Sequence, residues 1–311
     1  MNVQLVGVIG LGLMGRGICA ALLSRGIPVI AFDTRTDITT EVESHIETAL
    51  REMKNSAHWR NHFHWASTLE ALADCDYVVE SLPEDLQLKQ RVLKELESLV
   101  PVTTPIASNT SALPITVIQQ PLENPERVIG MHWAEPCHLT RFLEVIRGEQ
   151  TNDATTDITM ELGKRLGKDP SLVRRDVPGF IVNRLAYAMY REAFWLLENG
   201  VADIETIDRS FVNAISVWAD VAGPFRWMDL TGLAAYAEVM KRLFPELSQA
   251  TQPPQLIQDL VQQGACGAAS GQGFYSYGPG EAAHWANKLQ ENVKRVQPHL
   301  GHAENSNVVE N

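Results

Sequence analysis

The chain has 311 residues, of which 45% are hydrophobic and 21% are charged, and its formal net charge at pH 7 is −12. This length leaves room for about two domains with packed cores. The acidic balance disfavours a function that depends on neutralising phosphate backbones or anionic membrane surfaces, so nucleic acid and membranes are not expected as partners.

The start of the chain lacks the pattern of a secreted protein. Met1 to Leu5 lead directly into an apolar run, without a basic start or a signal-peptide cleavage site. No apolar stretch reaches the roughly 20 residues that a membrane-spanning helix needs. We therefore expect a soluble cytoplasmic protein. The cysteines are scattered, without the spacing of a metal site, and are expected to be buried apolar residues: Cys19, Cys75, Cys137 and Cys266.

The first half of the sequence alternates between strand and helix patterns. An apolar strand at 6–10, a helix from Leu13 to Ser24 and a strand from Pro28 to Phe32 form one β-α-β unit. Helical patterns separate the later strands, which are predicted at 77–82, 105–107, 128–131 and from residue 142 onwards. This alternation predicts an α/β domain of the doubly wound Rossmann type.

The second half has helical spacing only, over 179–197, 203–218 and 232–243. The turn-forming sequence Asp176-Val177-Pro178-Gly179 separates it from the first half. We predict a Rossmann-type domain over residues 1–178, an all-α C-terminal domain over 179–298 and a flexible tail over 299–311.

A glycine-rich turn joins the first predicted strand to the first predicted helix. Its sequence, Gly10-Leu11-Gly12-Leu13-Met14-Gly15, matches the dinucleotide-binding pattern G-x-G-x-x-G in the context that this pattern requires. The first glycine permits a tight turn, the second lets the backbone approach a pyrophosphate, and the third lets the helix pack closely on the strand. A glycine-rich turn that binds no ligand is the alternative.

An acidic residue favours the dinucleotide. Asp33 lies 18 residues after Gly15, at the end of the second predicted strand. A carboxylate there can accept hydrogen bonds from the ribose hydroxyls of NAD and would repel the additional phosphate of NADP. NAD is therefore the predicted cofactor, although Arg35 leaves an opening for the phosphorylated form.

Two ionisable residues stand within later apolar runs. His132 ends the run that begins at Arg127, and Glu144 lies inside the run Phe142 to Ile146. On general grounds such a histidine is either a hydrogen-bonded structural residue or a catalytic base, and the pattern alone leaves both possibilities open.

Several blocks of the sequence together resemble the L-3-hydroxyacyl-CoA dehydrogenase family, and they occur in the family's order. The main blocks are Ser108–Ser111, Pro125–His132, Leu143–Ile146 and Pro178–Arg184. Further matches are the glycine-rich turn, Val79–Lys89, Gly223–Phe225 and Gly271–Tyr275. The resemblance implies NAD-dependent oxidation of a short-chain L-3-hydroxyacyl-CoA to the 3-ketoacyl-CoA, in a homodimer formed through the helical domain.

The resemblance also implies roles for individual residues. His132 would be the general base and Glu144 the group that orients it. Ser111 and Asn183 would contact the substrate and the histidine, as part of the catalytic set. The implied cofactor contacts beyond the glycine-rich turn are Glu84, Lys89 and Asn109, and Arg226 is a further substrate contact.

The sequence departs from the family after the histidine. The usual Phe-Phe-Asn-Pro is replaced by Trp133-Ala134-Glu135-Pro136, which puts a carboxylate in place of an amide. Glu135 could act on His132, recognise a polar or cationic group of the substrate, or pair with Arg141. Basic residues for coenzyme A are also few, namely Arg51, Lys54 and Arg60 in the segment where the family places its acyl-CoA contacts. A free 3-hydroxy acid, as in the gulonate and carnitine dehydrogenases of the superfamily, is therefore an alternative substrate.

Two other classes of function stay open. The 3-hydroxyisobutyrate and 6-phosphogluconate dehydrogenases share the opening Gly-Leu-Gly-x-Met-Gly, but they use a lysine in the helix that joins their domains. Here that helix, after Pro178, has no lysine before Leu197. A protein that binds NAD as a sensor or structural protein without turnover is the other alternative, because a fold does not guarantee chemistry.

Overall fold

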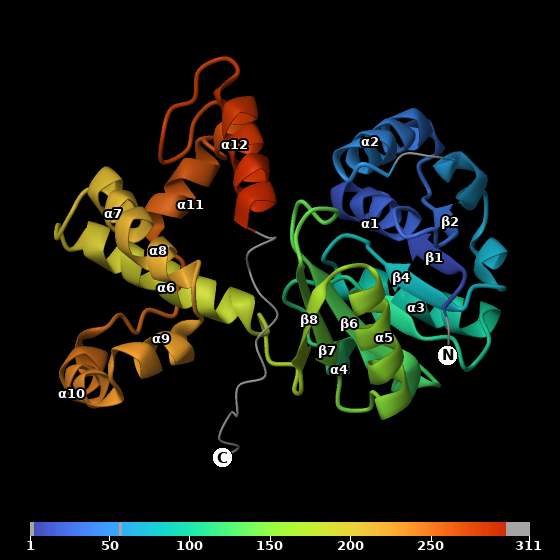
Figure 1. Cartoon of the computed structure of the whole chain (residues 1–311), viewed down its shortest axis with the longest axis horizontal. Helices are drawn as coiled ribbons and strands as arrows, with labels where there is room; N and C mark the ends of the chain where they lie inside the picture. The colour runs from blue at the N-terminus through green and yellow to red at the C-terminus, as the bar shows by residue number, and fades with distance from the viewer. Residues whose placement is uncertain (1–2, 56–57, 297–311) are drawn as a thin grey trace. The chain divides into compact units, whose positions relative to one another are not determined.

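The computed structural model describes residues 3–55 and 58–296, so the predicted tail at 299–311 lies outside the described residues. The chain divides into two compact units, Met1–Arg184 and Leu185–Asn311. Figure 1 shows one unit built around a sheet and another built from helices. No helix among the described residues is long and apolar enough to span a membrane.

The first unit contains an eight-stranded sheet in the order β3-β2-β1-β4-β5-β6-β7-β8. All neighbouring strands are parallel except β6 and β7, which are antiparallel. The strands are β1 Val6–Ile9, β2 Val29–Phe32, β3 Phe63–Ala66, β4 Tyr77–Glu80, β5 Ile106–Ser108, β6 Val128–Trp133, β7 Phe142–Arg147 and β8 Asp169–Val173. The predicted Rossmann-type fold is confirmed, and β3 and β8 are strands that the sequence pattern did not predict.

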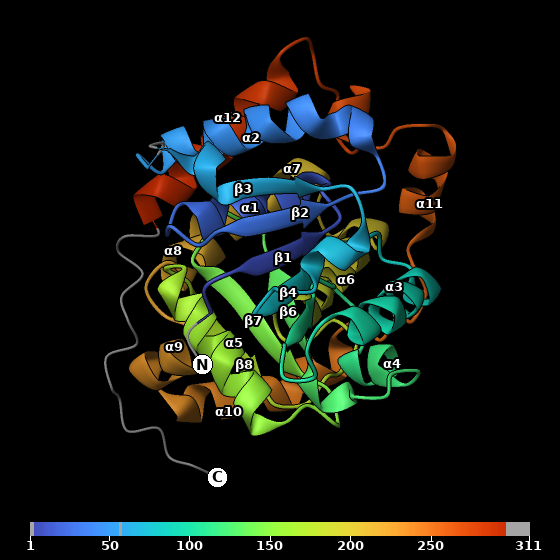
Figure 2. The ribbon, with the colours of Figure 1, turned by 90° about the vertical axis from the view of Figure 1, so that its right-hand side faces the viewer.

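Helices cover both faces of the sheet. They are α1 Leu13–Leu23, α2 Thr39–Glu52, α3 Leu86–Leu99, α4 Ile115–Gln119 and α5 Asp153–Arg165, with short 3-10 turns at Thr36–Ile38, Trp59–His62, Leu69–Leu72 and Pro125–Arg127. Successive residues of β4 point to opposite faces: Tyr77 and Val79 pack in the core beneath α1, α2 and α5, and Val78 packs in the core beneath α3 and α4. Figure 2 shows α3 and α4 on one side of the sheet and α5 on the other.

The second unit is helical, as predicted, and its described residues form no strand beyond the isolated bridges at Gly267–Gln272 and Gln272–Ser276. Helix α6 leads into it from the first unit. The helices are α6 Val182–Glu198, α7 Ile204–Ser210, α8 Ser216–Ala219, α9 Pro224–Thr231, α10 Leu233–Leu243, α11 Gln255–Gln262 and α12 Glu281–Val296, with 3-10 turns at Phe244–Glu246 and Ala268–Ser270.

Two further details differ from the sequence predictions. The helix predicted over 203–218 is divided by a π-helical segment, Phe211–Ile215, which lies between α7 and α8. A pattern with a period of 3.6 residues does not reveal such a local change of pitch. The cysteines Cys19, Cys75 and Cys137 are buried, but Cys266 is exposed, contrary to the prediction.

Candidate active site

The glycine-rich turn has the geometry that a bound pyrophosphate requires. Gly10 has φ +84°, and a Cβ there would lie 2.6 Å from the carbonyl oxygen of Ser81. A Cβ on Gly15 would lie 1.8 Å from the carbonyl oxygen of Gly10, so the helix could not approach the strand as it does. A Cβ on Gly12, the N-cap of α1, would meet nothing within 4 Å, so this side of the turn is open. The N-terminus of α1 therefore presents its positive end to an open space.

Asp33 is tied to this turn. Its Oδ2 accepts a hydrogen bond from the Leu11 N–H at 2.8 Å, and its Oδ1 accepts bonds from the N–H and Nε of Arg35 at 2.9 and 3.3 Å. Burial alone would raise the pKa of Asp33, but these donors and the Arg35 charge lower it below 3.8. The carboxylate is therefore ionised at neutral pH, as a ribose acceptor must be. The turn and the carboxylate together fit NAD.

The three side chains inside the turn lie in different environments. Leu11 is buried, Leu13 is about half exposed, and Met14 is partly buried against the core. The Met14 carbonyl accepts a weak bond from the Cys137 thiol at 3.6 Å. The loop after β6, to which Cys137 belongs, therefore contacts the dinucleotide turn.

His132 and Glu144 face each other across two strands. The antiparallel register of β6 and β7 pairs them directly, so their side chains leave the same face of the sheet. Nδ1 of His132 lies 2.8 Å from Oε2 of Glu144, and both side chains are buried. The rings of Phe142 and Phe180 lie 5.4 and 5.9 Å from the imidazole, measured between ring centres. The bond to Nδ1 leaves Nε2 as the nitrogen that can exchange a proton with a substrate.

The second oxygen of Glu144 is also engaged. Oε1 accepts hydrogen bonds from the N–H groups of Ile181 and Val182, at 3.1 and 2.9 Å, where α6 begins. A buried carboxylate without donors would be unstable in its charged form. These two donors, at the positive end of a helix, stabilise that form.

Glu84, Ser111 and Asn183 form one network. Oε1 of Glu84 accepts bonds from the Thr110 hydroxyl at 2.6 Å and from the N–H groups of Ser111 and Ala112 at 2.9 and 3.0 Å. The Asn183 side-chain amide donates to the Ser111 carbonyl at 2.7 Å. Hydrogen bonds thus hold both the N–H and the carbonyl of Ser111, and the residue itself is exposed.

Lys89 supports this network from the interior. Its ammonium is fully buried and lies 2.8 Å from Oε1 of Glu80 and 3.7 Å from Oε2 of Glu84. It also donates to the carbonyl of Asn109, whose side chain receives a long bond from the Trp133 N–H at 3.4 Å. Glu80 was not predicted as a site residue. A carboxylate in a strand that is otherwise apolar was the available signal, because such residues are buried only when paired.

Among the described residues of the first unit, Glu135 has no hydrogen bond to this set. Glu135 is exposed, and its Oε2 lies 3.7 Å from the Cys137 sulfur. Arg141, its predicted surface partner, lies 3.6 Å from Asp169. Arg226 belongs to α9 of the second unit.

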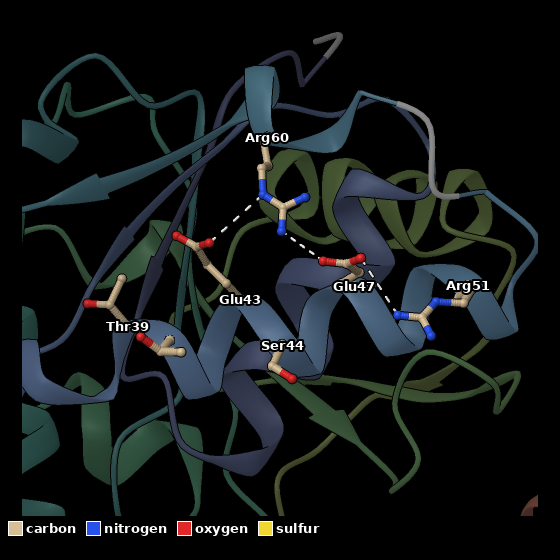
Figure 3. A pocket seen from close by; sticks show the side chains of 7 residues that line it. Thr39, Glu43, Ser44, Glu47, Arg51 and Arg60 are labelled. Carbon is tan, nitrogen blue, oxygen red and sulfur yellow. Dashed lines mark hydrogen bonds and ion pairs between the residues drawn. The ribbon is translucent and has the colours of Figure 1, made fainter.

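Two of the three basic residues considered for coenzyme A, Arg51 and Arg60, are paired with carboxylates. They line a hollow of about 340 Å³ beside α2, drawn in Figure 3, and Lys54 is not part of its lining. The guanidinium of Arg60 lies 2.7 Å from Glu47 and 3.9 Å from Glu43, and that of Arg51 lies 3.6 Å from Glu47. The charges of this hollow are therefore balanced internally, which leaves little net attraction for a phosphate group.

Comparisons with known proteins match both units. The profile of the 3-hydroxyacyl-CoA dehydrogenase NAD-binding domain matches residues 5–177, and that of the C-terminal domain matches residues 179–277. The probable 3-hydroxybutyryl-CoA dehydrogenase of Deinococcus radiodurans is 34% identical over 87% of this chain and 99% of its own length.

A relative with another substrate is equally similar. The 5-formyl-3-hydroxy-2-methylpyridine 4-carboxylate 5-dehydrogenase of Mesorhizobium japonicum is 34% identical over 88% of this chain and 91% of its own length. A crystal structure of a 5-dehydrogenase acting on this pyridine carboxylic acid, described as an NAD+-dependent dismutase, has a TM-score of 0.89 and 31% identity, and the match covers 96% of this chain and 99% of that one.

Proposed function

The chain belongs to the 3-hydroxyacyl-CoA dehydrogenase family and is an NAD-dependent oxidoreductase, and on this premise we propose that it oxidises the 3-hydroxyl of a short L-3-hydroxyacyl-CoA. The observation that carries the proposal is the buried pair of His132 and Glu144, whose 2.8 Å contact leaves Nε2 available to a substrate hydroxyl. A neutral imidazole has the basicity that deprotonation of an alcohol at neutral pH needs.

His132 and Glu144 would have separate roles in one proton transfer. Nε2 of His132 accepts the hydroxyl proton as the C3–H bond breaks, and the Oε2 of Glu144 holds the Nδ1 proton and stabilises the resulting imidazolium. Ser111, in a turn that Glu84 and Asn183 hold in place, would contact the substrate. In the reverse direction the protonated His132 is the acid.

The cofactor would be held by the glycine-rich turn and Asp33. The N-terminus of α1, with Gly12 as its N-cap, would receive the pyrophosphate, and Asp33 would accept the ribose hydroxyls. When bound, NAD+ supplies the acceptor for the hydride that leaves C3.

A second candidate substrate is a free hydroxy acid or a related small carboxylate. Two observations favour it. Arg51 and Arg60 are already paired with glutamates, so Lys54 is the one basic residue named for coenzyme A that has no ion pair in the described part of the chain. One similar protein is named as a dehydrogenase of a pyridine carboxylate, which is not a thioester.

The deciding experiment compares a coenzyme A thioester with the corresponding free acid as substrate. NADH absorbance would be followed with acetoacetyl-CoA and with free acetoacetate, using the wild-type protein and His132→Gln. We expect rapid NADH loss with the thioester and loss of that activity in His132→Gln, with NADH binding retained, because the histidine is not part of the glycine-rich turn.

The outcomes separate the candidates. Turnover of the free acid alone would support the second substrate class and make Glu135 the first residue to test for recognition. Turnover that survives in His132→Gln would contradict the assignment of the base. NADH binding without oxidation by any 3-keto compound would contradict both candidates.

A further inference from the structure

Phe180 has a backbone conformation that is unusual for its residue type. Its φ is +51°, and that of the preceding Gly179 is +79°. The left-handed region is open to glycine but disfavoured for a bulky side chain. Phe180 is also buried, with 1% of its surface exposed, so this conformation is fixed by its surroundings. Such a residue is a reason to look for a function nearby.

Gly179 and Phe180, the two left-handed residues, form a turn that brings the following backbone N–H groups to Glu144. The Phe180 N–H bonds to the carbonyl of Val177 at 3.0 Å, which closes the turn. The next two N–H groups, of Ile181 and Val182, then both point to Oε1 of Glu144, while Oε2 holds His132. The orientation of the carboxylate that fixes the histidine is therefore set by this turn.

The side chain of Phe180 also packs against His132, the partner of Glu144. Its ring centre lies 5.9 Å from that of His132, with an angle of 54° between the ring planes. Phe142 packs against the imidazole from another direction, at 5.4 Å and 86°. Packing against two aromatic rings restricts rotation of the imidazole.

We propose that Phe180 is a positioning residue for the proposed reaction, and that it acts mainly through its left-handed backbone, which aims two N–H donors at Glu144. This inference rests on the proposed catalytic roles of His132 and Glu144. Phe180 would act through Glu144 and would not touch the reacting atoms.

Two substitutions separate the backbone from the ring. Phe180→Gly keeps the left-handed conformation without strain but removes the ring and leaves a cavity. Phe180→Ile keeps an apolar side chain, but its branched Cβ strongly disfavours a positive φ. If Phe180 were only a packing residue, Gly would be the more harmful change in every measurement. If the backbone positions Glu144, Ile would be the more harmful change for kcat.

A third variant tests the turn without removing any packing. A Cβ on Gly179 would meet the side chains of Arg184 and Asn183 at 3.5 Å, which is an ordinary contact distance. Gly179→Ala therefore strains only the backbone, and it keeps the proposal testable if Phe180→Ile does not fold. Gly26→Ala is a matched control, because Gly26 is exposed, has φ +67°, and a Cβ there would meet nothing within 4 Å.

The experiment measures kcat, KM, melting temperature and the far-downfield proton signal of the bond between His132 Nδ1 and Glu144 Oε2. We expect Phe180→Ile and Gly179→Ala to lose this signal and to lower kcat by about tenfold or more, with KM nearly unchanged, since displacement of a catalytic group by about 1 Å can cost a hundredfold. Phe180→Gly should have the lowest melting temperature but keep the signal and most of kcat. Gly26→Ala should keep both.

The inference is overturned if Phe180→Gly has the lowest kcat, or if Phe180→Ile and Gly179→Ala keep both the signal and kcat. Failure of the proposed function would look different, because Glu144→Gln would then turn over normally or the wild-type protein would not turn over at all. The proton signal requires no turnover, so the ranking of the variants can still be read in that case.

Discussion

Glu84 contacts the turn that carries Ser111, although the family resemblance implied a contact with the cofactor. Three donors from Thr110, Ser111 and Ala112 converge on its Oε1. Burial would raise the pKa of Glu84, but these donors and Lys89 outweigh it and lower the pKa below 4.5, so the carboxylate is charged at neutral pH. Because Ser111 is the proposed substrate contact, we expect Glu84 to affect substrate binding through this turn.

We predict that Glu84→Ala raises KM for the substrate by about tenfold, because the turn loses a charged acceptor worth about 1.5 to 3 kcal/mol. The dissociation constant of NADH, measured by fluorescence titration, should change little. Glu84→Gln keeps an oxygen acceptor and should have an intermediate KM. A large loss of NADH affinity with unchanged KM would instead favour the direct cofactor contact.

Asp33 and Arg35 should decide between the two nicotinamide cofactors. The Asp33 carboxylate now accepts bonds from both the N–H and the guanidinium of Arg35. In Asp33→Ser the carboxylate that repels a 2′-phosphate is removed and Arg35 becomes free to bind it. We predict that NADH affinity falls about tenfold and that NADPH affinity rises. Parallel titrations with both cofactors test this, and an unchanged ratio of the two affinities would refute it.

The residues of the site could be predicted from the sequence more easily than their contacts. His132 and Glu144 stood out because each is ionisable within an apolar run. Their direct pairing depends on the register of β6 and β7, which the intervening loop sets and the pattern does not reveal. The contact of Glu84 with Ser111 joins residues 27 positions apart, and only the fold brings these together.

At the scale of elements, the central strands were predictable and the edge strands were not. The predicted strand at 77–82 is Tyr77–Glu80, four buried residues of which three are apolar, and such buried runs are typical of a central parallel strand. The edge strand β3 contains exposed His64, and the edge strand β8 contains Pro170, so neither has an apolar run. They form because neighbouring strands supply hydrogen-bond partners, which is information outside the local sequence.

Lys168, between α5 and β8, anchors the loop that follows β6. Its buried ammonium donates to the carbonyls of Cys137 and Thr140 and lies 5.0 Å from the centre of the Trp133 ring. Burial, together with the nearby charge of Arg25, lowers the pKa of Lys168 from 10.5 to about 8. Between these two values the unfolded chain holds a proton that the folded chain has released, so this lysine makes the protein more stable as pH rises.

We predict that the free energy of unfolding of the wild-type protein, relative to that of Lys168→Met, increases by about 1 to 2 kcal/mol from pH 7.5 to pH 9.5. Urea unfolding at both pH values measures this difference. Comparison with the methionine variant cancels the titration of all other groups. A relative stability that is constant or falls with pH would show that Lys168 keeps its proton in the folded chain.

At the scale of the molecule, composition and alternation predicted one α/β and one helical part, whereas the domain boundary at residue 178 stays a prediction. The local pattern does not show the order of the eight strands, because β1 lies between β2 and β4, although every pair of neighbours other than β1 and β4 is consecutive in the chain. The second unit has a further property that helical periodicity does not reveal. Among its described residues, the only buried apolar side chain is Ala222.

This lack of buried apolar residues leads to a prediction about assembly. Many large apolar side chains of the second unit are more than one third exposed in the single chain, including Tyr187 on α6, Phe225 on α9 and Val239 on α10. Exposed apolar surface on this scale is unfavourable in water and marks an interface. Closed symmetric dimers are the commonest way in which a chain covers such a surface with its own copy. We therefore predict a homodimer formed through the helical unit.

Sedimentation equilibrium at micromolar concentration should give twice the chain mass of 34.5 kDa. The double variant Val239→Glu with Leu243→Glu puts two charges four residues apart on one face of α10, where both side chains are about half exposed. We expect it to weaken the dimer at least about tenfold, because charges at a buried interface lose their hydration. Val102→Glu, at an exposed apolar residue of the first unit, is the matched control and should leave the mass unchanged. A wild-type chain that sediments as a monomer at this concentration would leave the apolar surface of the second unit without its proposed partner.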